Sequence, residues 1–81
     1  MSARVTLYTR QGCHLCEAAR ATVERVCADL GEQYDEVDVD TDPELRERYT
    51  DEVPVTFVDG RQHDFWRVDE RRLRRALGAA R

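Results

Sequence analysis

The segment Gly12-Cys13-His14-Leu15-Cys16 decides how the rest of this 81-residue chain is interpreted. Residues 4–9 before it mix β-branched and aromatic side chains in rough alternation, which predicts a strand. From residue 13 to about residue 30, apolar or small residues recur at steps of three and four, which predicts a helix with one buried face. Gly31 then supplies the C-terminal cap of that helix. Two cysteines three residues apart therefore lie where a strand passes into a helix.

Cys13, at the start of the predicted helix, is the candidate nucleophile. A thiol attacks a disulfide as its thiolate, and an ordinary thiol with a pKa of about 8.5 is mostly protonated at neutral pH. Unpaired backbone N–H groups and the positive end of the helix dipole favour an anion at this position. Cys16 lies one turn further on the same side, with about 5–6 Å between the Cβ atoms, so a small shift allows a disulfide. We predict that Cys13 attacks and that the more sheltered Cys16 resolves the mixed disulfide.

Two more elements are expected in the middle of the chain. Residues 34–40 alternate valine with acidic residues, which predicts a strand at an edge of the sheet. Residues 41–44, Thr-Asp-Pro-Glu, combine a capping candidate, a proline tolerated in the first turn and early acids. They predict a short helix to about residue 49, with Leu45 and Tyr49 as its buried stripe.

The last third of the chain predicts a hairpin and a final helix. Asp59-Gly60 is a two-residue turn signal between expected strands at residues 54–58 and 61 to about 66. Asp69 can cap a helix whose apolar face holds Leu73, Ala76, Leu77 and Ala80. The predicted order of elements is βαβαββα, in one domain of residues 1–81.

Composition and charge exclude several classes of protein. The formal net charge is −4, with eleven acidic residues against two arginines in residues 29–52 and seven arginines against three acidic residues in residues 61–81. These two oppositely charged regions are either two solvated faces of the protein or the source of an electrostatic field that orients a protein partner. The acidic balance and the lack of interleaved basic and aromatic residues disfavour nucleic-acid binding, and no apolar run is long enough for a membrane span. Without a signal segment at its N-terminus, the chain is expected in the cytoplasm.

The pattern as a whole resembles the glutaredoxin-like branch of the thioredoxin-fold superfamily, over nearly the whole chain. The resemblance rests on Cys-x-x-Cys at a helix start, the acidic second strand, and Val53-Pro54 before a hairpin and a last helix. It implies an α/β fold with a four-stranded mixed sheet in the order 2-1-3-4, flanked by three helices. It also implies that Cys13 is the nucleophile, that Cys16 resolves, and that Pro54 is a cis-proline packed beside them. The backbone of Val53 would then pair with an extended substrate.

The sequence departs from the pattern of dithiol glutaredoxins at two places. His14-Leu15 stands between the cysteines where those proteins have Pro-Tyr. The segment after the fourth expected strand has no glycine pair followed by an acidic residue, which those proteins use to hold glutathione. The sequence therefore does not predict dependence on glutathione.

Three further residues have two interpretations each, and Cys27 has one. His14 either stabilises the thiolate as a cation or points into solvent. Arg10 either stabilises the thiolate or is solvated at the end of its strand. Tyr8 belongs either to the core, which we favour, or to the wall of the substrate groove. Cys27 is three turns further along the helix than Cys16, so we expect a small buried hydrophobic residue there.

We predict a cytoplasmic thiol–disulfide oxidoreductase that cycles a Cys13–Cys16 dithiol and disulfide without a bound cofactor. Its substrates would be disulfides of proteins or small thiols, its electrons would come from a low-molecular-weight thiol or a reductase, and it would be a monomer. The alternative is a thioredoxin-fold binding module, or an iron–sulfur or zinc carrier that uses Cys13 as a ligand. A zinc site wants four ligands, for which Cys27, His14 and His63 are the remaining candidates. The position of the motif at a helix start favours the redox interpretation over the metal site.

Overall fold

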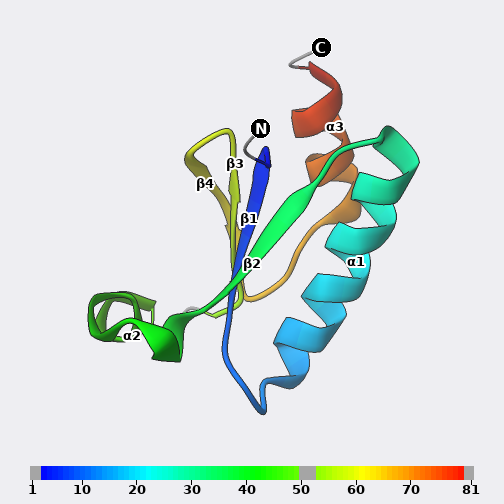
Figure 1. The fold of residues 1–81 in the computed structure, drawn as a ribbon. Coiled ribbons are helices and arrows are strands. Elements are labelled where there is room, and N and C mark those ends of the chain that lie inside the picture. Colours follow the sequence, from blue (N-terminus) through cyan, green and yellow to red (C-terminus); the bar gives the residue numbers. More distant parts are fainter. Residues whose placement is uncertain (1–2, 50–52, 80–81) are drawn as a thin grey trace.

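The computed structural model describes residues 3–49 and 53–79 (Figure 1). Its elements, in chain order, are β1 (Val5–Thr9), α1 (His14–Leu30), β2 (Tyr34–Asp38), the 3-10 turn η1 (Val39–Thr41), α2 (Pro43–Tyr49), β3 (Val55–Val58), β4 (Arg61–Phe65) and α3 (Glu70–Ala79). This is the predicted βαβαββα order with one added 3-10 turn.

The four strands form one mixed sheet in the order β2-β1-β3-β4. β1 pairs in parallel with β2 and antiparallel with β3, and β3 pairs antiparallel with β4. The predicted strand order is therefore confirmed. β2 lies at an edge, where its acidic side chains discourage pairing with the strand of another chain.

Two hydrophobic clusters lie on opposite faces of the sheet, because alternate residues of a strand point to opposite sides. On the first face, Val5 and Leu7 of β1 pack with α1 and α3. On the second face, the cluster is built on Val39, Tyr49 and Val55 and lies next to α2. The helices α1 and α3 therefore cover one face of the sheet and α2 the other, as Figure 1 shows.

The predicted turns and caps have the expected geometry. Gly31 ends α1 in the left-handed conformation, with a φ of 69°, and its N–H group donates to the carbonyl oxygen of Cys27. Asp59 and Gly60 both have positive φ, 53° and 82°, as a two-residue hairpin turn requires. At the start of α3, the carboxylate of Asp69 accepts the N–H of Arg72 at 3.1 Å. Leu73 and Leu77 of α3 are fully buried and Ala76 is half-buried, whereas Ala80 lies outside the described residues.

β2 ends two residues earlier than predicted, and β4 ends within one residue of its predicted end. β2 stops at Asp38 and not at Asp40, because the carboxylate of Asp38 accepts the N–H of Asp40 and its carbonyl accepts the hydroxyl of Thr41. These bonds wind the chain into η1 and bury Val39. β4 stops at Phe65, because Trp66 has a φ of 66° and leaves the extended conformation. None of the described helices is long and apolar enough to cross a membrane.

Candidate active site

The candidate site lies where β1 passes into α1, at the lower end of the sheet in Figure 1. Gly12 has a φ of 74°, a conformation that residues with a Cβ rarely adopt, and it turns the chain toward the helix. Cys13 follows in an extended conformation as the N-cap of α1. The strand, the glycine turn and the helix together fix the position of the first cysteine.

The Cys13 sulfur takes the place of the oxygen that usually caps a helix. Its Sγ accepts a hydrogen bond from the backbone N–H of Cys16 at 3.1 Å. Helix N-termini carry partial positive charge, and hydrogen bonds to a charged acceptor are stronger than bonds to a neutral one. The site is therefore built so that a negative charge on Cys13 Sγ meets a fixed donor. Cys13 is half-buried, so its sulfur remains within reach of a substrate.

Cys16 has a different environment from Cys13. Its side chain is 1% exposed and faces the interior of the protein. Burial, and then the hydrogen bond with Cys13, raise the pKa of the Cys16 thiol well above its ordinary value, although a backbone hydrogen bond from Arg10 opposes them. Cys16 therefore keeps its proton at neutral pH while the motif is reduced. This asymmetry fits an attacking Cys13 and a resolving Cys16.

The segment Val53-Pro54 leads into β3, and the peptide bond between the two residues is cis. Pro54 is buried and Val53 is half-buried against the second hydrophobic cluster. The carbonyl oxygen of Pro54 accepts the N–H of Trp66 at 2.7 Å. The start of β3 is thereby joined to the residue that follows β4.

Arg10 and Tyr8 have partners other than the cysteine sulfurs. The guanidinium of Arg10 forms an ion pair with Asp40 at 3.1 Å, between the end of β1 and η1. The ring of Tyr8 stacks on Tyr49 with 5.2 Å between centroids and meets Phe57 edge-on at 5.5 Å. Tyr8 therefore packs in the second hydrophobic cluster, and the structure favours its interpretation as a core residue. The other interpretation, in which Tyr8 also lines the substrate groove, stays a prediction.

The remaining candidates, His14, Cys27 and His63, lie in three different environments. His14 is exposed in the first turn of α1. Cys27 is 2% exposed within the first hydrophobic cluster, as expected for a structural residue. His63 lies in β4, where burial lowers the pKa of its imidazole. Within residues 3–49 and 53–79, no three His, Cys, Asp or Glu side chains are grouped closely enough to hold a metal ion.

The structure adds two residues that the sequence analysis did not place among the candidates. Leu15, between the two cysteines, and Trp66, after β4, are large apolar residues with exposed fractions of 45% and 51%. Both line a pocket of about 310 Å³ beside the motif. The sequence already indicated that Leu15 is exposed, because this apolar residue lies one position off the buried stripe of α1. For Trp66, alternation in the fourth expected strand predicts that either Phe65 or Trp66 is exposed, near the substrate groove or under the last helix, and the structure shows that Trp66 is exposed.

Comparisons with known proteins identify a family that covers almost the whole chain. Residues 4–78 match the family described as "Glutaredoxin-like domain (DUF836)". An uncharacterized protein of Mycobacterium tuberculosis is 38% identical over 76 residues, which cover 88% of this chain and 78% of that protein.

Two solved structures have folds similar to that of this chain. The X-ray structure of the target protein XcR50 from X. campestris has a TM-score of 0.76 at 36% identity, covering 95% of this chain and 99% of that one. The X-ray structure of Fasciola hepatica thioredoxin has a TM-score of 0.64 at 24% identity, covering 95% and 79%, and shows the shared fold. With a thioredoxin-like fold, a Cys-x-x-Cys motif at the start of α1 and a family match over almost its full length, the chain belongs to the glutaredoxin-like domain (DUF836) family.

Proposed function

We propose that this protein is a thiol–disulfide oxidoreductase that works through Cys13 and Cys16. One observation carries the proposal: the Cys13 sulfur caps α1 within reach of solvent, while Cys16 lies buried behind it and donates its N–H to that sulfur. The thioredoxin-like fold and the glutaredoxin-like family support a thiol-oxidoreductase-like module.

The reaction transfers two electrons in two exchanges. First, the Cys13 thiolate attacks one sulfur of the substrate disulfide, so a Cys13–substrate bond forms, the substrate S–S bond breaks, and the leaving thiolate takes up a proton. Cys16 then gives its proton to solvent and attacks Cys13 Sγ, so the Cys13–Cys16 disulfide forms, the Cys13–substrate bond breaks, and the second substrate thiolate leaves and takes up a proton from solvent. A low-molecular-weight thiol or a reductase returns two electrons to the protein and restores both thiols.

The biological setting belongs to the same proposal. We expect disulfides of proteins or small thiols as substrates, because Cys13 is within reach of solvent and Cys16 lies directly behind it. We place the protein in the cytoplasm, where paired cysteines serve catalysis more often than structure. The protein is proposed to act as a monomer, because each chain carries both cysteines of the cycle.

Trapping of mixed disulfides tests the assigned roles. In a Cys27→Ala background, Cys16→Ser leaves an attacking thiol without a resolving one, so it should accumulate a mixed disulfide with a model disulfide substrate. Cys13→Ser should accumulate none, because its remaining thiol is buried. Mass spectrometry after acid quenching measures both.

Equal trapping by the two variants contradicts the assigned roles. No trapping by either variant, together with iron or zinc in protein purified without oxygen, contradicts the oxidoreductase and favours the metal-carrier alternative.

A further inference from the structure

The loop between β4 and α3, residues 66–69, places an apolar surface beside the cysteine motif. Trp66 of this loop and Leu15 of α1 line a pocket of about 310 Å³, which we call the Trp66 pocket. Its other lining residues are Ala18, Ala19, Thr22, Arg67 and Val68. Leu15 and Trp66 are the two large hydrophobic residues that the described part of the chain leaves exposed. Exposed apolar side chains gathered around one pocket are typical of a binding surface.

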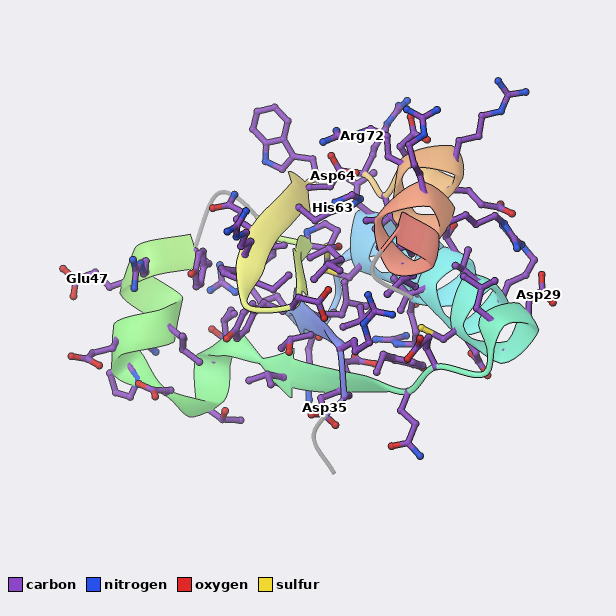
Figure 2. The ribbon with its side chains drawn as sticks, turned by 90° about the horizontal axis from the view of Figure 1, so that it is seen from above. Asp29, Asp35, Glu47, His63, Asp64 and Arg72 are labelled. Atoms are coloured by element: carbon purple, nitrogen blue, oxygen red, sulfur yellow. The ribbon has the colours of Figure 1, made fainter. Side chains whose placement is uncertain are left out.

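The loop that carries Trp66 is fixed at both ends. At its start, the N–H of Trp66 donates to the carbonyl oxygen of Pro54 at 2.7 Å. At its end, the N–H of Asp69 donates to the carboxylate of Asp64 at 3.2 Å, and Arg72 binds the other oxygen of Asp64 at 2.8 Å. Figure 2 shows Asp64 and Arg72 close together between β4 and α3. A loop whose backbone is held in this way loses little further freedom when a partner binds.

The backbone conformation of Trp66 also indicates that the loop is held in place beside the motif. Its φ of 66° lies in the left-handed region, which is uncommon for a residue with a large side chain. Such conformations persist where the surroundings enforce them, and they gather at binding sites. Here the conformation ends β4 and leaves the indole 51% exposed beside the motif.

Arg67 adds a positive charge to the rim of the Trp66 pocket. Among the described residues, it makes no hydrogen bond or ion pair, whereas the neighbouring Arg72 and Arg74 bind Asp64, Asp29 and Glu70. An exposed arginine without a carboxylate partner is available to a carboxylate of a ligand. The Trp66 pocket therefore combines an apolar wall with one cation.

This inference rests on the oxidoreductase function proposed above and names its substrate class. We propose that the Trp66 pocket binds a segment of a disulfide-containing protein substrate, taking an apolar side chain that lies near the substrate cysteine and next to an acidic residue. The volume of about 310 Å³ is at the lower end of the range for ligand pockets, roughly 300–1,000 Å³, and so fits one side chain and not a large cofactor. A small thiol that has a carboxylate but no apolar group would bind Arg67 and would not contact Leu15 or Trp66.

Single-turnover reduction of designed peptides tests the proposal. Four peptides of equal length each carry one intramolecular disulfide, flanked by Leu-Glu, Ser-Glu, Leu-Lys or Ser-Lys. Hydroxyethyl disulfide is the neutral small substrate, and glutathione disulfide is the small substrate with carboxylates. Fully reduced protein is mixed with each disulfide in excess, and the Cys13–Cys16 disulfide is followed by acid quenching, alkylation and mass spectrometry. Each rate constant is divided by that of dithiothreitol with the same disulfide, which removes the intrinsic reactivity of the substrate.

For the wild-type protein we expect the Leu-Glu peptide to react about tenfold faster than the Ser-Lys peptide, the scale on which a small apolar pocket discriminates. Trp66→Asn should remove the preference for leucine over serine, because asparagine tolerates the left-handed backbone but has no apolar surface. Arg67→Gln should remove the preference for glutamate over lysine, and high salt should weaken the same preference in the wild type. Arg61→Gln, at the hairpin on the opposite end of the sheet, is the matched control and should keep both preferences.

The possible failures are distinguishable. If the wild-type protein reduces none of the disulfides, the proposed function itself is contradicted. If it reduces hydroxyethyl disulfide but all four peptides at one rate, or if Trp66→Asn keeps the leucine preference, only the peptide-binding inference is overturned. A preference for glutathione disulfide that depends on Arg67, without any preference among the peptides, also overturns it and assigns the pocket to a small thiol.

Discussion

Burial gives the thiol of Cys27 a measurable effect on stability. Burial, and then the negative charge of Glu32, raise the pKa of this thiol above its ordinary value. The folded protein therefore holds the proton more tightly than the unfolded chain does. The resulting contribution to stability is complete below the pKa of the unfolded thiol, about 8.5, and is lost as the pH rises toward the folded value.

Cys27→Ala is therefore expected to make stability less sensitive to alkaline pH. At pH 7 the variant should lose about 1 kcal/mol because packing in the first cluster is removed. Between pH 7 and pH 10 the wild type should lose more stability than the variant, by at most about 2 kcal/mol, because each pH unit above the thiol pKa costs up to about 1.4 kcal/mol. Urea unfolding of both proteins with a reductant present measures the difference. Parallel stability curves over this pH range would show that Cys27 ionises equally in both states.

At the scale of single elements, local turn chemistry is the part of the fold that the sequence predicts best. The Asp59-Gly60 turn and the Gly31 cap depend on residues within a few positions, and both were predicted correctly. The predicted end of β2 was wrong by two residues, because it depends on the side-chain bond of Asp38, which alternation of residue types does not reveal.

Replacing Gly31 and Gly78 by alanine is expected to change stability in opposite directions. A Cβ at Gly31 would meet no atom within 4 Å, so the cost of Gly31→Ala comes from the backbone alone. Since alanine disfavours a φ of 69°, the variant should lose about 1 kcal/mol of unfolding free energy. Gly78→Ala is the matched control, because Gly78 lies in α3 with equally open surroundings. Alanine is the better helix former, so this variant should gain up to about 1 kcal/mol. Urea denaturation of both variants tests this, and the same sign of change in both would contradict it.

At the scale of the whole molecule, Arg4 joins several segments at the end of the sheet opposite the cysteines. Arg4, next to β1, binds Asp59 of the hairpin, Glu32 after α1 and the carbonyl oxygen of Leu77 in α3. Four segments distant in sequence are joined there, at the upper end of the sheet in Figure 1. The cysteines lie at the other end of β1. Arg4 therefore stabilises the end of the sheet that is remote from the reactive turn at the N-terminus of α1.

Residue spacing predicted the part of the candidate site that depends on one helix. Helical spacing placed Cys13 at the cap and Cys16 behind it, and both are found there. Arg10 pairs with Asp40, thirty residues away, and Tyr8 stacks on Tyr49, so no local pattern could identify their partners. The Trp66 pocket joins α1 to a loop fifty residues later, and it also required the fold.

The most direct test of the account is a redox titration of the reduced protein in thiol–disulfide buffers of defined potential. Free thiols are counted at each potential by alkylation and mass spectrometry, with Cys27→Ala as the background that removes the third thiol. The account predicts one two-electron transition that converts Cys13 and Cys16 together into a disulfide, at a potential between about −270 and −120 mV, the range of dithiol oxidoreductases of this fold. If both thiols remained free across that whole range, the Cys13–Cys16 cycle would be contradicted.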